Sequence, residues 1–392
     1  MACPPNDSPL DHAQRPDFGC PLVLLPLHRA LALAERALFL TPPNPRVGCV
    51  ITSTDGAVLG EGHTQAVGGP HAEVMALRDA AARGHEVRGA TVWVTLEPCA
   101  HFGRTPPCCD ALAAAGVRRV VVTNVDPNPR VAGAGIARLR AAGVVVDLLP
   151  QDDPLALASR ELNLGFFSRM VRGRPWVRLK VAASADGRTA LPNGVSQWIT
   201  SPEARSDGHR WRARACAVLT GAGTVLADDP RLDARGVDAP RQPHAVVLDS
   251  QLRTPPTAQL FQVAHKVWIF TTHADSVRRA ALEARGAEVI RVAATPDGRV
   301  ALDAVMAELA RREVNEVHVE AGETLNGAWL ATGLADEVLL YQAPRLLGAG
   351  RGMVALRPFT TLDEAPALVW RDATPVGPDL RLRACVAGHE RF

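Results

Sequence analysis

Hydrophobic and polar positions in the first half of the chain follow alternating periods. Leu27, Leu31, Ala34 and Leu38 recur at the spacing of one helix face. Strands separated by helices of similar length favour an α/β layer with a largely parallel sheet. We predict strands over residues 47–51, 91–96, 120–123 and 144–149, and helices over 71–83, 107–115 and 134–141.

The second half of the chain repeats this alternation after a break. Thr200-Ser-Pro-Glu203 fits a capping box with a proline in the first turn, so a helix should run to about Ala213. The pattern predicts a second α/β domain. Its other elements are strands over 176–183, 217–220, 245–249, 267–271, 289–292, 317–320 and 337–341, and helices over 275–284, 302–312 and 325–331.

These patterns divide the chain into four parts. Residues 1–24 carry no periodic pattern and are expected to form a disordered leader. Residues 25–150 should form the first domain and residues 176–392 the second. Residues 151–175 should supply a connecting helix and a linker, because Arg172-Gly-Arg-Pro175 is typical of a chain break.

Composition narrows the class of protein. The 392 residues are 47% hydrophobic and 21% charged, which is typical of globular domains. A net charge of +2 gives no reason to expect nucleic acid or a membrane as partner. Eight cysteines without an apolar signal segment favour a cytoplasmic protein whose thiols are buried, metal-bound or catalytic.

One imidazole and two thiol groups occur at a spacing that would allow them to bind one zinc ion together. His71 precedes a predicted helix, Cys99 follows a predicted strand, and a second cysteine follows at Cys108. Three protein ligands leave the fourth zinc position open for water, which is the catalytic arrangement. Zinc then lowers the pKa of that water to about 7. We therefore predict a catalytic zinc site.

Glu73 completes this pattern. In zinc nucleobase deaminases, the order H-x-E…P-C-x-x-C supplies a glutamate that acts as general acid/base and not as a ligand. His71 and Glu73 are two residues apart, so on a helix they should not share a face, which suits two different roles.

The second cysteine departs from the generic spacing. Phe102 stands where a cysteine is expected, and Cys108 and Cys109 come later, after two prolines that suit a helix start. A helix N-terminus favours a thiolate, so residue geometry leaves both cysteines open as the ligand. If Cys109 were a fourth ligand, the site would be closed and the chain a zinc-stabilised binding protein. A tRNA-type nucleic-acid deaminase with an accessory domain is a further alternative, although it should be more basic.

The residues of the second half are less specific by themselves. Gly221-Ala-Gly-Thr224 follows a predicted strand and could approach a cofactor phosphate. It lacks the third glycine of the G-x-G-x-x-G dinucleotide motif, so a Rossmann fold is not supported.

Several motifs together resemble one known family, the bifunctional deaminase/reductase of riboflavin biosynthesis. The resemblance covers roughly residues 25–385. In the first half it is carried by Thr41-Pro-Pro-Asn-Pro-Arg-Val-Gly-Cys49, His71-Ala-Glu73, Thr95-Leu-Glu-Pro-Cys99, Gly103-Arg-Thr-Pro-Pro-Cys-Cys109 and Asp126-Pro-Asn-Pro129. In the second half it is carried by Lys180-Val-Ala-Ala-Ser-Ala-Asp-Gly-Arg188, Ser196-Gln-Trp-Ile-Thr-Ser201, Gly223-Thr-Val-Leu-Ala-Asp-Asp-Pro230 and Val319-Glu-Ala-Gly-Glu-Thr-Leu325.

The resemblance implies an N-terminal cytidine-deaminase-like α/β/α domain and a C-terminal dihydrofolate-reductase-like α/β domain. It implies deamination of 2,5-diamino-6-ribosylamino-4(3H)-pyrimidinone 5′-phosphate, then reduction of the ribosyl group with NADPH to give 5-amino-6-ribitylamino-uracil 5′-phosphate. The long spacing from Cys99 to Cys108 is this family's own form, so the resemblance selects Cys108 as the ligand. It also implies a homo-oligomer associated through the reductase domains.

The resemblance further implies the contacts of both ligands. His101, Arg104 and Thr105 are candidates for the substrate phosphate. The cofactor residues it implies are Ala182, Trp198, Thr224, Asp228, Ser250, Gly322, Glu323, Thr324, Leu325, Asn326, Gly327 and Ala328. The substrate residues it implies are Asn44, Ser196, Arg212, Leu232, Arg235 and Glu320.

Elementary chemistry suits some of these positions. Arg212 and Arg235 can bind a phosphate through two hydrogen bonds each. The helix expected after Gly322 can present free N–H groups to an anion, although a carboxylate at Glu323 is unfavourable there unless it points away. Lys180 or Asp228 could protonate the sugar carbonyl oxygen during hydride transfer.

Overall fold

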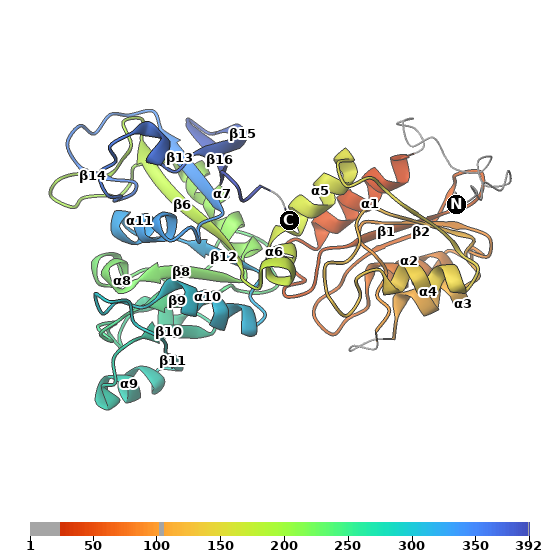
Figure 1. Cartoon of the computed structure of the whole chain (residues 1–392), viewed down its shortest axis with the longest axis horizontal. Coiled ribbons are helices and arrows are strands. Elements are labelled where there is room, and N and C mark those ends of the chain that lie inside the picture. The colour runs from red at the N-terminus through yellow and green to blue at the C-terminus, as the bar shows by residue number, and fades with distance from the viewer. Residues whose placement is uncertain (1–23, 102–105, 391) are drawn as a thin grey trace, which may run out of the picture. The chain divides into compact units, whose positions relative to one another are not determined.

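The computed structural model describes residues 24–101, 106–390 and 392. The predicted leader lies outside these residues except for Leu24. Contacts divide the chain into two units (Figure 1). Of the described residues, the first unit contains those up to Ala37 and those within Arg46–Asp126 and Arg130–Leu162. The second unit contains those within Leu38–Pro45, Pro127–Pro129 and Asn163–Phe392. The predicted connection over 151–175 holds two helices, one in each unit.

The first unit is a five-stranded sheet with helices on both faces. Its strand order is β2-β1-β3-β4-β5. Its helices are α1 (Leu25–Arg36), α2 (Ala72–Ala82), α3 (Cys108–Ala114), α4 (Ala134–Ala141) and α5 (Pro154–Leu162). Its strands are β1 (Gly48–Thr52), β2 (Val58–His63), β3 (Thr91–Val94), β4 (Arg119–Val122) and β5 (Val145–Leu148).

Strand direction in this sheet is mixed. β3, β4 and β5 are parallel, as expected, but β1 is antiparallel to both β2 and β3. Sequence analysis missed β2 because Gly60 and Gly62 interrupt its apolar pattern. Those glycines allow α2 to approach the strand, since a Cβ at Gly60 would lie 2.4 Å from the Ala76 carbonyl oxygen.

The helices of the first unit cover opposite faces of its sheet. In Figure 1, α2, α3 and α4 lie on one side and α1 and α5 on the other. Leu27 and Leu31 of α1 pack with Val50, Trp93 and Leu155 in one buried cluster. The regularly spaced leucines of α1 are therefore part of this core. The opposite face of the sheet can then hold the predicted metal residues.

The second unit is built on a nine-stranded sheet with the order β11-β10-β9-β8-β12-β6-β13-β16-β15. Its helices are α6 (Leu164–Arg172), α7 (Pro202–Arg214), α8 (Ala222–Asp228), α9 (Ser276–Glu283), α10 (Leu302–Arg311) and α11 (Glu323–Ala331). Its strands are β6 (Trp176–Ser184), β7 (Arg188–Ala190), β8 (Ala217–Gly221), β9 (His244–Leu248), β10 (Val267–Thr271), β11 (Ala287–Arg291), β12 (Glu316–Val319), β13 (Glu337–Ala343), β14 (Arg351–Gly352), β15 (Leu368–Val376) and β16 (Asp379–Val386).

Seven of these strands, from β11 to β13 in the sheet order, are parallel to their neighbours. The hairpin β15–β16 adds two antiparallel strands, which the sequence analysis missed. Charged residues interrupt the apolar pattern of both strands, and Asp372 on β15 pairs with Arg381 and Arg383 on β16. Polar cross-strand pairs thus support a strand that hydrophobicity does not reveal.

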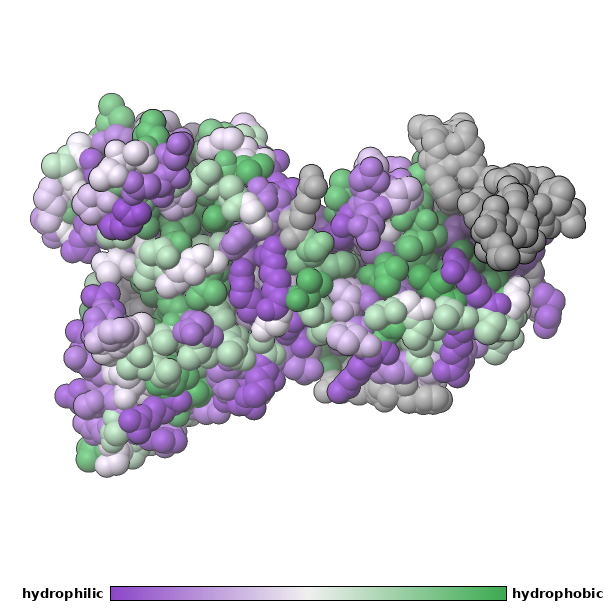
Figure 2. Space-filling view, in the orientation of Figure 1, coloured by the Kyte–Doolittle hydropathy of each residue, from purple (hydrophilic) through white to green (hydrophobic). Residues whose placement is uncertain are grey.

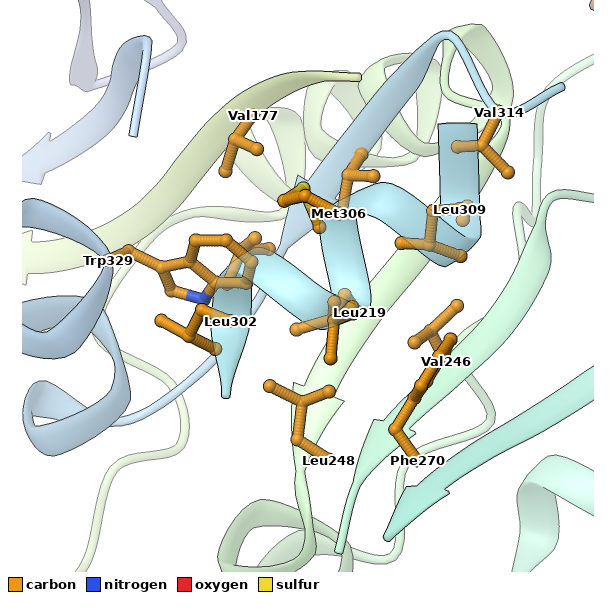
Figure 3. Close-up of a cluster of buried hydrophobic side chains, with 14 of the residues drawn as sticks. Val177, Leu219, Val246, Leu248, Phe270, Leu302, Met306, Leu309, Val314 and Trp329 are labelled. Carbon is orange, nitrogen blue, oxygen red and sulfur yellow. The ribbon is translucent and has the colours of Figure 1, made fainter. Parts of the chain in front are cut away.

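Two buried clusters lie on opposite faces of this sheet. Alternate residues of a strand point to opposite faces, so Leu219 packs under α10 and α11 while Val218 packs under α8 and α9. Figure 3 shows the larger cluster, in which Met306 and Leu309 of α10 and Trp329 of α11 meet the sheet.

One predicted cap was wrong by one residue. Ser201, not Thr200, is the N-cap of α7, and its hydroxyl accepts a hydrogen bond from the Ala204 N–H at 3.2 Å. Pro202 then takes the first helical position, where its missing N–H costs nothing.

The surface shown in Figure 2 mixes hydrophilic and hydrophobic residues over both units. Across the described residues, we find no helix whose length and apolar character would let it cross a membrane.

Candidate active sites

Three side chains of the first unit converge as a zinc site requires. The ligand atoms of His71, Cys99 and Cys108 all lie within 4.8 Å of one another. The His71 Nδ1 atom is 3.6 Å from the Cys99 Sγ atom and 3.3 Å from the Cys108 Sγ atom. Usual zinc bond lengths in a tetrahedral site put such atoms about 3.6 Å apart. These separations therefore suit a zinc ion held by all three residues.

Local structure brings His71 and Glu73 to the same place. His71 is the N-cap of α2 with an extended backbone, and Glu73 is buried in the first turn. The expectation that both lie on different helix faces does not apply, because His71 precedes the helix. The Glu73 carboxyl group interacts with the Cys108 thiol, so acid/base group and ligands share one pocket.

The pKa shifts of the cysteines and of Glu73 favour a cation bound between them. Hydrogen bonds from Cys108 and His71 lower the pKa of Cys99 to about 4. The hydrogen bond to Cys99, with burial, raises the pKa of the Cys108 thiol, because two adjacent sulfur anions are unfavourable there. Burial also raises the pKa of Glu73 to about 7. A divalent cation would remove the repulsion between the two thiolates.

Cys109 faces a different environment. Its thiol contacts the Asp110 carboxylate at 3.6 Å, and burial raises its pKa to about 11. Within residues 24–101 and 106–390, no fourth histidine, cysteine or acidic residue joins the group of His71, Cys99 and Cys108. The geometry is that of an open site and favours Cys108 over Cys109.

Other predicted residues of the deaminase site are less well defined. Arg104 and Thr105 lie outside the described residues. His101 is half-buried, and its Nδ1 atom has no hydrogen-bond partner among the described residues. Asn44 lies in a turn closed by its own N–H and the Thr41 carbonyl oxygen at 2.8 Å. The roles of these residues in substrate binding remain predictions.

In the second unit, the predicted residues follow the carboxyl ends of parallel strands. Thr224 follows β8, Ser250 follows β9, and Glu320 follows β12. The carboxyl ends of adjacent parallel strands form one edge of a sheet, which is where open α/β sheets bind ligands. The sheet therefore gathers residues that are far apart in the sequence.

Arg212 and Glu320 form the centre of this edge. The Arg212 Nε and Nη2 atoms donate to the two Glu320 carboxylate oxygens at 2.5 and 2.7 Å. Although burial opposes it, Arg212 holds the pKa of Glu320 well below its usual range. Arg212 therefore already binds a carboxylate. This limits its capacity to form the predicted pair of hydrogen bonds with a phosphate.

The loop after α8 is tied to the same pair. Arg212 donates to the Asp233 carbonyl oxygen at 2.9 Å, and the Asp233 carboxylate pairs with Arg235. Leu232 is buried beside it with a positive φ of 54°. Burial lowers the pKa of His209, which accepts from the Arg235 N–H, to about 4. Sequence analysis missed Asp233 and His209 because neither stands in a recognisable spacing.

Lys180 lies close to this pair. It is on β6, its ammonium is 5.9 Å from the centre of the Tyr341 ring, and it interacts electrostatically with Glu320. Burial lowers the pKa of Lys180 despite that carboxylate. Its neighbour Ala182, a predicted cofactor residue, is half-buried on the same strand.

The residues at the start of α11 have different environments. The Glu323 carboxylate accepts a hydrogen bond from the Gly352 N–H at 2.8 Å, so it points toward β14, and its contact with the cofactor remains a prediction. Asn326 donates to the Met353 carbonyl oxygen at 3.1 Å, and a Cβ at Gly327 would lie 2.0 Å from the Ala355 carbonyl oxygen. These two residues pack against the chain. Gly322, Thr324, Leu325 and Ala328 are exposed or half-buried.

Three predicted residues lie in open positions. Trp198 is exposed, with the Arg205 guanidinium 4.4 Å from its ring centre. Ser196 is half-buried two residues earlier in the same loop, and Asp228 is exposed at the end of α8. Their contacts with substrate or cofactor remain predictions.

Comparisons with known proteins match both units of the chain. Residues 25–124 match the family described as "Cytidine and deoxycytidylate deaminase zinc-binding region", and residues 175–382 match "RibD C-terminal domain". The chain is 46% identical to the riboflavin biosynthesis protein RibD of Escherichia coli over 369 residues, covering 90% of this chain and 96% of that protein. It is 40% identical to the corresponding protein of Haemophilus influenzae, covering 91% and 95%.

Solved structures are similar over the same length. Acinetobacter baumannii RibD aligns with a TM-score of 0.83 and 40% identity, covering 92% of this chain and 98% of that one. A Thermotoga maritima protein, described as a diaminohydroxyphosphoribosylaminopyrimidine deaminase/5-amino-6-(5-phosphoribosylamino)uracil reductase, aligns with a TM-score of 0.81 and 30% identity, covering 92% and 98%.

Fold and site together define a zinc-type deaminase joined to a reductase, that is, an enzyme with two activities. The expected cytidine-deaminase-like domain is N-terminal and the reductase domain is C-terminal. The chain belongs to the RibD family of bifunctional deaminase/reductases of riboflavin biosynthesis. This assignment favours the bifunctional enzyme over the tRNA-type deaminase and over the binding protein.

Proposed function

We propose that the chain deaminates 2,5-diamino-6-ribosylamino-4(3H)-pyrimidinone 5′-phosphate and then reduces the ribosyl group of the product with NADPH. The deaminase and reductase activities described for the Thermotoga maritima relative support this substrate. We assign deamination to residues 25–150 and reduction to residues 176–392, with 151–175 as the connection.

The observation that carries the deaminase assignment is the group of His71, Cys99 and Cys108 beside the buried Glu73. Zinc, when bound there, lowers the pKa of water so that hydroxide is available near neutral pH. Glu73 accepts a proton from the attacking water and donates it to the ring nitrogen. It then takes the proton of the hydroxyl group newly bound to the ring carbon and donates it to the amino group, which leaves as ammonia as the carbonyl forms.

The pair of Arg212 and Glu320 supports the reductase assignment. NADPH supplies the hydride, which is delivered to C1 of the sugar in its open-chain form. Lys180 donates the proton to the carbonyl oxygen. It is half-buried close to Glu320, whereas Asp228 is exposed, so we favour Lys180 over Asp228 as the donor. Arg212 orients Glu320 toward the substrate and keeps it ionised.

Glu73→Ala tests the deaminase mechanism. Ammonia release from the diaminopyrimidinone phosphate should fall by about 10²–10⁴-fold, the usual contribution of one general acid/base group. Zinc content should stay at the wild-type level, and NADPH oxidation with the deaminated intermediate should be unchanged. Retained ammonia release in this variant would refute the role of Glu73.

Location and assembly are further parts of the proposal. We propose a cytoplasmic enzyme, because Cys49, Cys99, Cys108, Cys109 and Cys216 are buried cysteines that form no disulfide. We also propose that copies associate through the second unit, as the family resemblance implies. Size-exclusion chromatography with light scattering of the whole chain tests the assembly, and a monomer at micromolar concentration would contradict it.

A further inference from the structure

Helix α4 receives its N-terminal cap from a distant residue. Its own N-cap is Gly133, with a φ of 89° and no side-chain cap. The first N–H groups of a helix need acceptors from outside it. Here the Glu97 Oε1 atom accepts from the Gly135 and Ile136 N–H groups at 2.9 and 3.1 Å. A residue two positions before Cys99 therefore caps α4.

The second oxygen of the same carboxylate is equally occupied. The Glu97 Oε2 atom accepts from the Asp126 N–H at 3.0 Å and from the Gly133 N–H at 2.9 Å. The Glu97 residue is only 3% exposed, so these charge-assisted bonds are shielded from water. Gly135 allows the close approach, because a Cβ there would lie 1.9 Å from the Pro98 carbonyl oxygen.

A second connection runs from the next turn of α4. The Arg138 Nη1 atom donates to the Ala100 carbonyl oxygen at 3.2 Å, directly after Cys99. Arg138 also binds both oxygens of Asp110, with Nε 2.7 Å from Oδ1 and Nη2 2.8 Å from Oδ2. Asp110 lies in the first turn of α3, two residues after Cys108. Figure 1 shows α3 and α4 on the same side of the sheet.

The two cysteine segments are also joined to each other. The Cys108 N–H points to the Cys99 Sγ atom at 3.3 Å, and the Cys109 N–H donates to the Cys99 carbonyl oxygen at 3.2 Å. Each of these bonds depends on how the loop after β3 lies against α3. Helix α4 holds that loop through Glu97 and Arg138, and holds α3 through Arg138.

We propose that α4 acts as a brace for the metal site and that Glu97 is its main positioning residue. Glu97 does not reach the ligands, but its four hydrogen bonds fix the segment that carries Cys99. Arg138 then sets the separation of that segment from Cys108. This inference rests on the proposed zinc site and adds a function for a glutamate that the deamination mechanism does not use.

Glu97→Gln is the test. A glutamine keeps the size but has one acceptor oxygen, and its NH₂ group would face two N–H donors. We expect this variant to release zinc to a chromogenic chelator about 10- to 100-fold faster than the wild type. Its affinity for zinc should be weaker by the same factor, as for other residues that support metal ligands. The kcat of ammonia release should fall with it, whereas NADPH oxidation with the deaminated intermediate should not change.

Two further variants make the result decisive. Asp147→Asn is the matched control, because it neutralises a part-buried carboxylate that pairs with Arg119 at 3.0 Å within the same unit. It should keep wild-type zinc release. Arg138→Met, at a half-exposed position, should fold readily and release zinc faster, by less than Glu97→Gln.

The outcomes separate the brace from the zinc site itself. If the wild-type protein binds no zinc, the proposed function fails and the brace has nothing to hold. If the wild type binds zinc but Glu97→Gln and Arg138→Met release it at the wild-type rate, the brace is wrong. Equal acceleration by Asp147→Asn would also overturn it, because the effect would then be general loss of stability.

Discussion

The two candidate sites differ in how their residues are brought together. The metal site takes its residues from two helix starts and the loop after β3, within about 40 positions of sequence, and its chemistry is visible in residue type alone. The reductase edge collects Lys180, Arg212, Asp233 and Glu320 from four separate segments of the second unit. The first site is defined by ligand chemistry, and the second by sheet topology and ion pairs.

The strongest test of this difference is the pair Cys108→Ala and Cys109→Ala. Cys108→Ala removes a zinc ligand, so zinc should be lost and ammonia release should fall by at least about 10³-fold, given that the bound metal generates the nucleophile. Cys109→Ala removes a thiol that contacts Asp110 and should keep both zinc and activity. Metal analysis and an ammonia assay measure the two effects. Reversed results would assign the ligand to Cys109.

The second test addresses the ion pairs of the reductase unit. Arg178 is fully buried and bridges Glu316 at 3.2 Å and Glu337 at 2.9 Å. Arg178→Met should lower the free energy of unfolding by about 3–5 kcal/mol, because it leaves two buried carboxylates without this partner. Urea unfolding followed by fluorescence measures this. A loss below 1 kcal/mol would show that Arg214 and Arg383 suffice.

The same pairs determine a dependence on pH. Although burial opposes it, Arg178 and Arg383 lower the pKa of Glu337 to about 2. Since the unfolded value is about 4.3, the folded-state pKa is depressed. The stabilisation is therefore complete above about pH 4.3 and is lost as the pH falls toward 2. Arg178→Met should make the free energy of unfolding less dependent on pH over this range.

A smaller effect is expected from Arg212→Lys. A lysine keeps the charge but cannot form both bonds to Glu320. We expect kcat/KM of NADPH oxidation to fall about 10- to 100-fold, equivalent to one charge-assisted hydrogen bond, with ammonia release unchanged. Separate assays of the two steps measure this. If ammonia release fell equally, the sites would not be independent.

The smallest effect is expected at the cap of α7. Ser201→Ala removes the acceptor of the Ala204 N–H, at a cost of about 1 kcal/mol of stability. Thr200→Ala should cost less, because the Thr200 hydroxyl does not cap the helix. Thermal unfolding of both variants compares them. A larger loss for Thr200→Ala would restore the capping box that the sequence favoured.

Sequence analysis predicted most elements of both units because their apolar periods are regular. It missed β2, where glycines that admit α2 interrupt the pattern, and the β15–β16 hairpin, whose strands are held by cross-strand ion pairs. It suggested that Gly221–Thr224 could approach a cofactor phosphate, which stays a prediction, and in the structure α8 starts at Ala222 within this segment. A local sequence pattern fails to predict a strand where the stabilisation comes from a partner element and not from the strand itself.

For the candidate sites, the sequence by itself determined the chemistry. His71, Glu73, Cys99 and Cys108 carry ligand and acid/base groups whose types and order indicate zinc deamination. Only the tertiary structure decided which groups meet. It directed Cys109 to Asp110, joined Arg212 to Glu320, turned Glu323 toward Gly352, and made Glu97 the cap of α4. Residue type sets what a side chain can bind, but its partner depends on long-range packing that no local spacing contains.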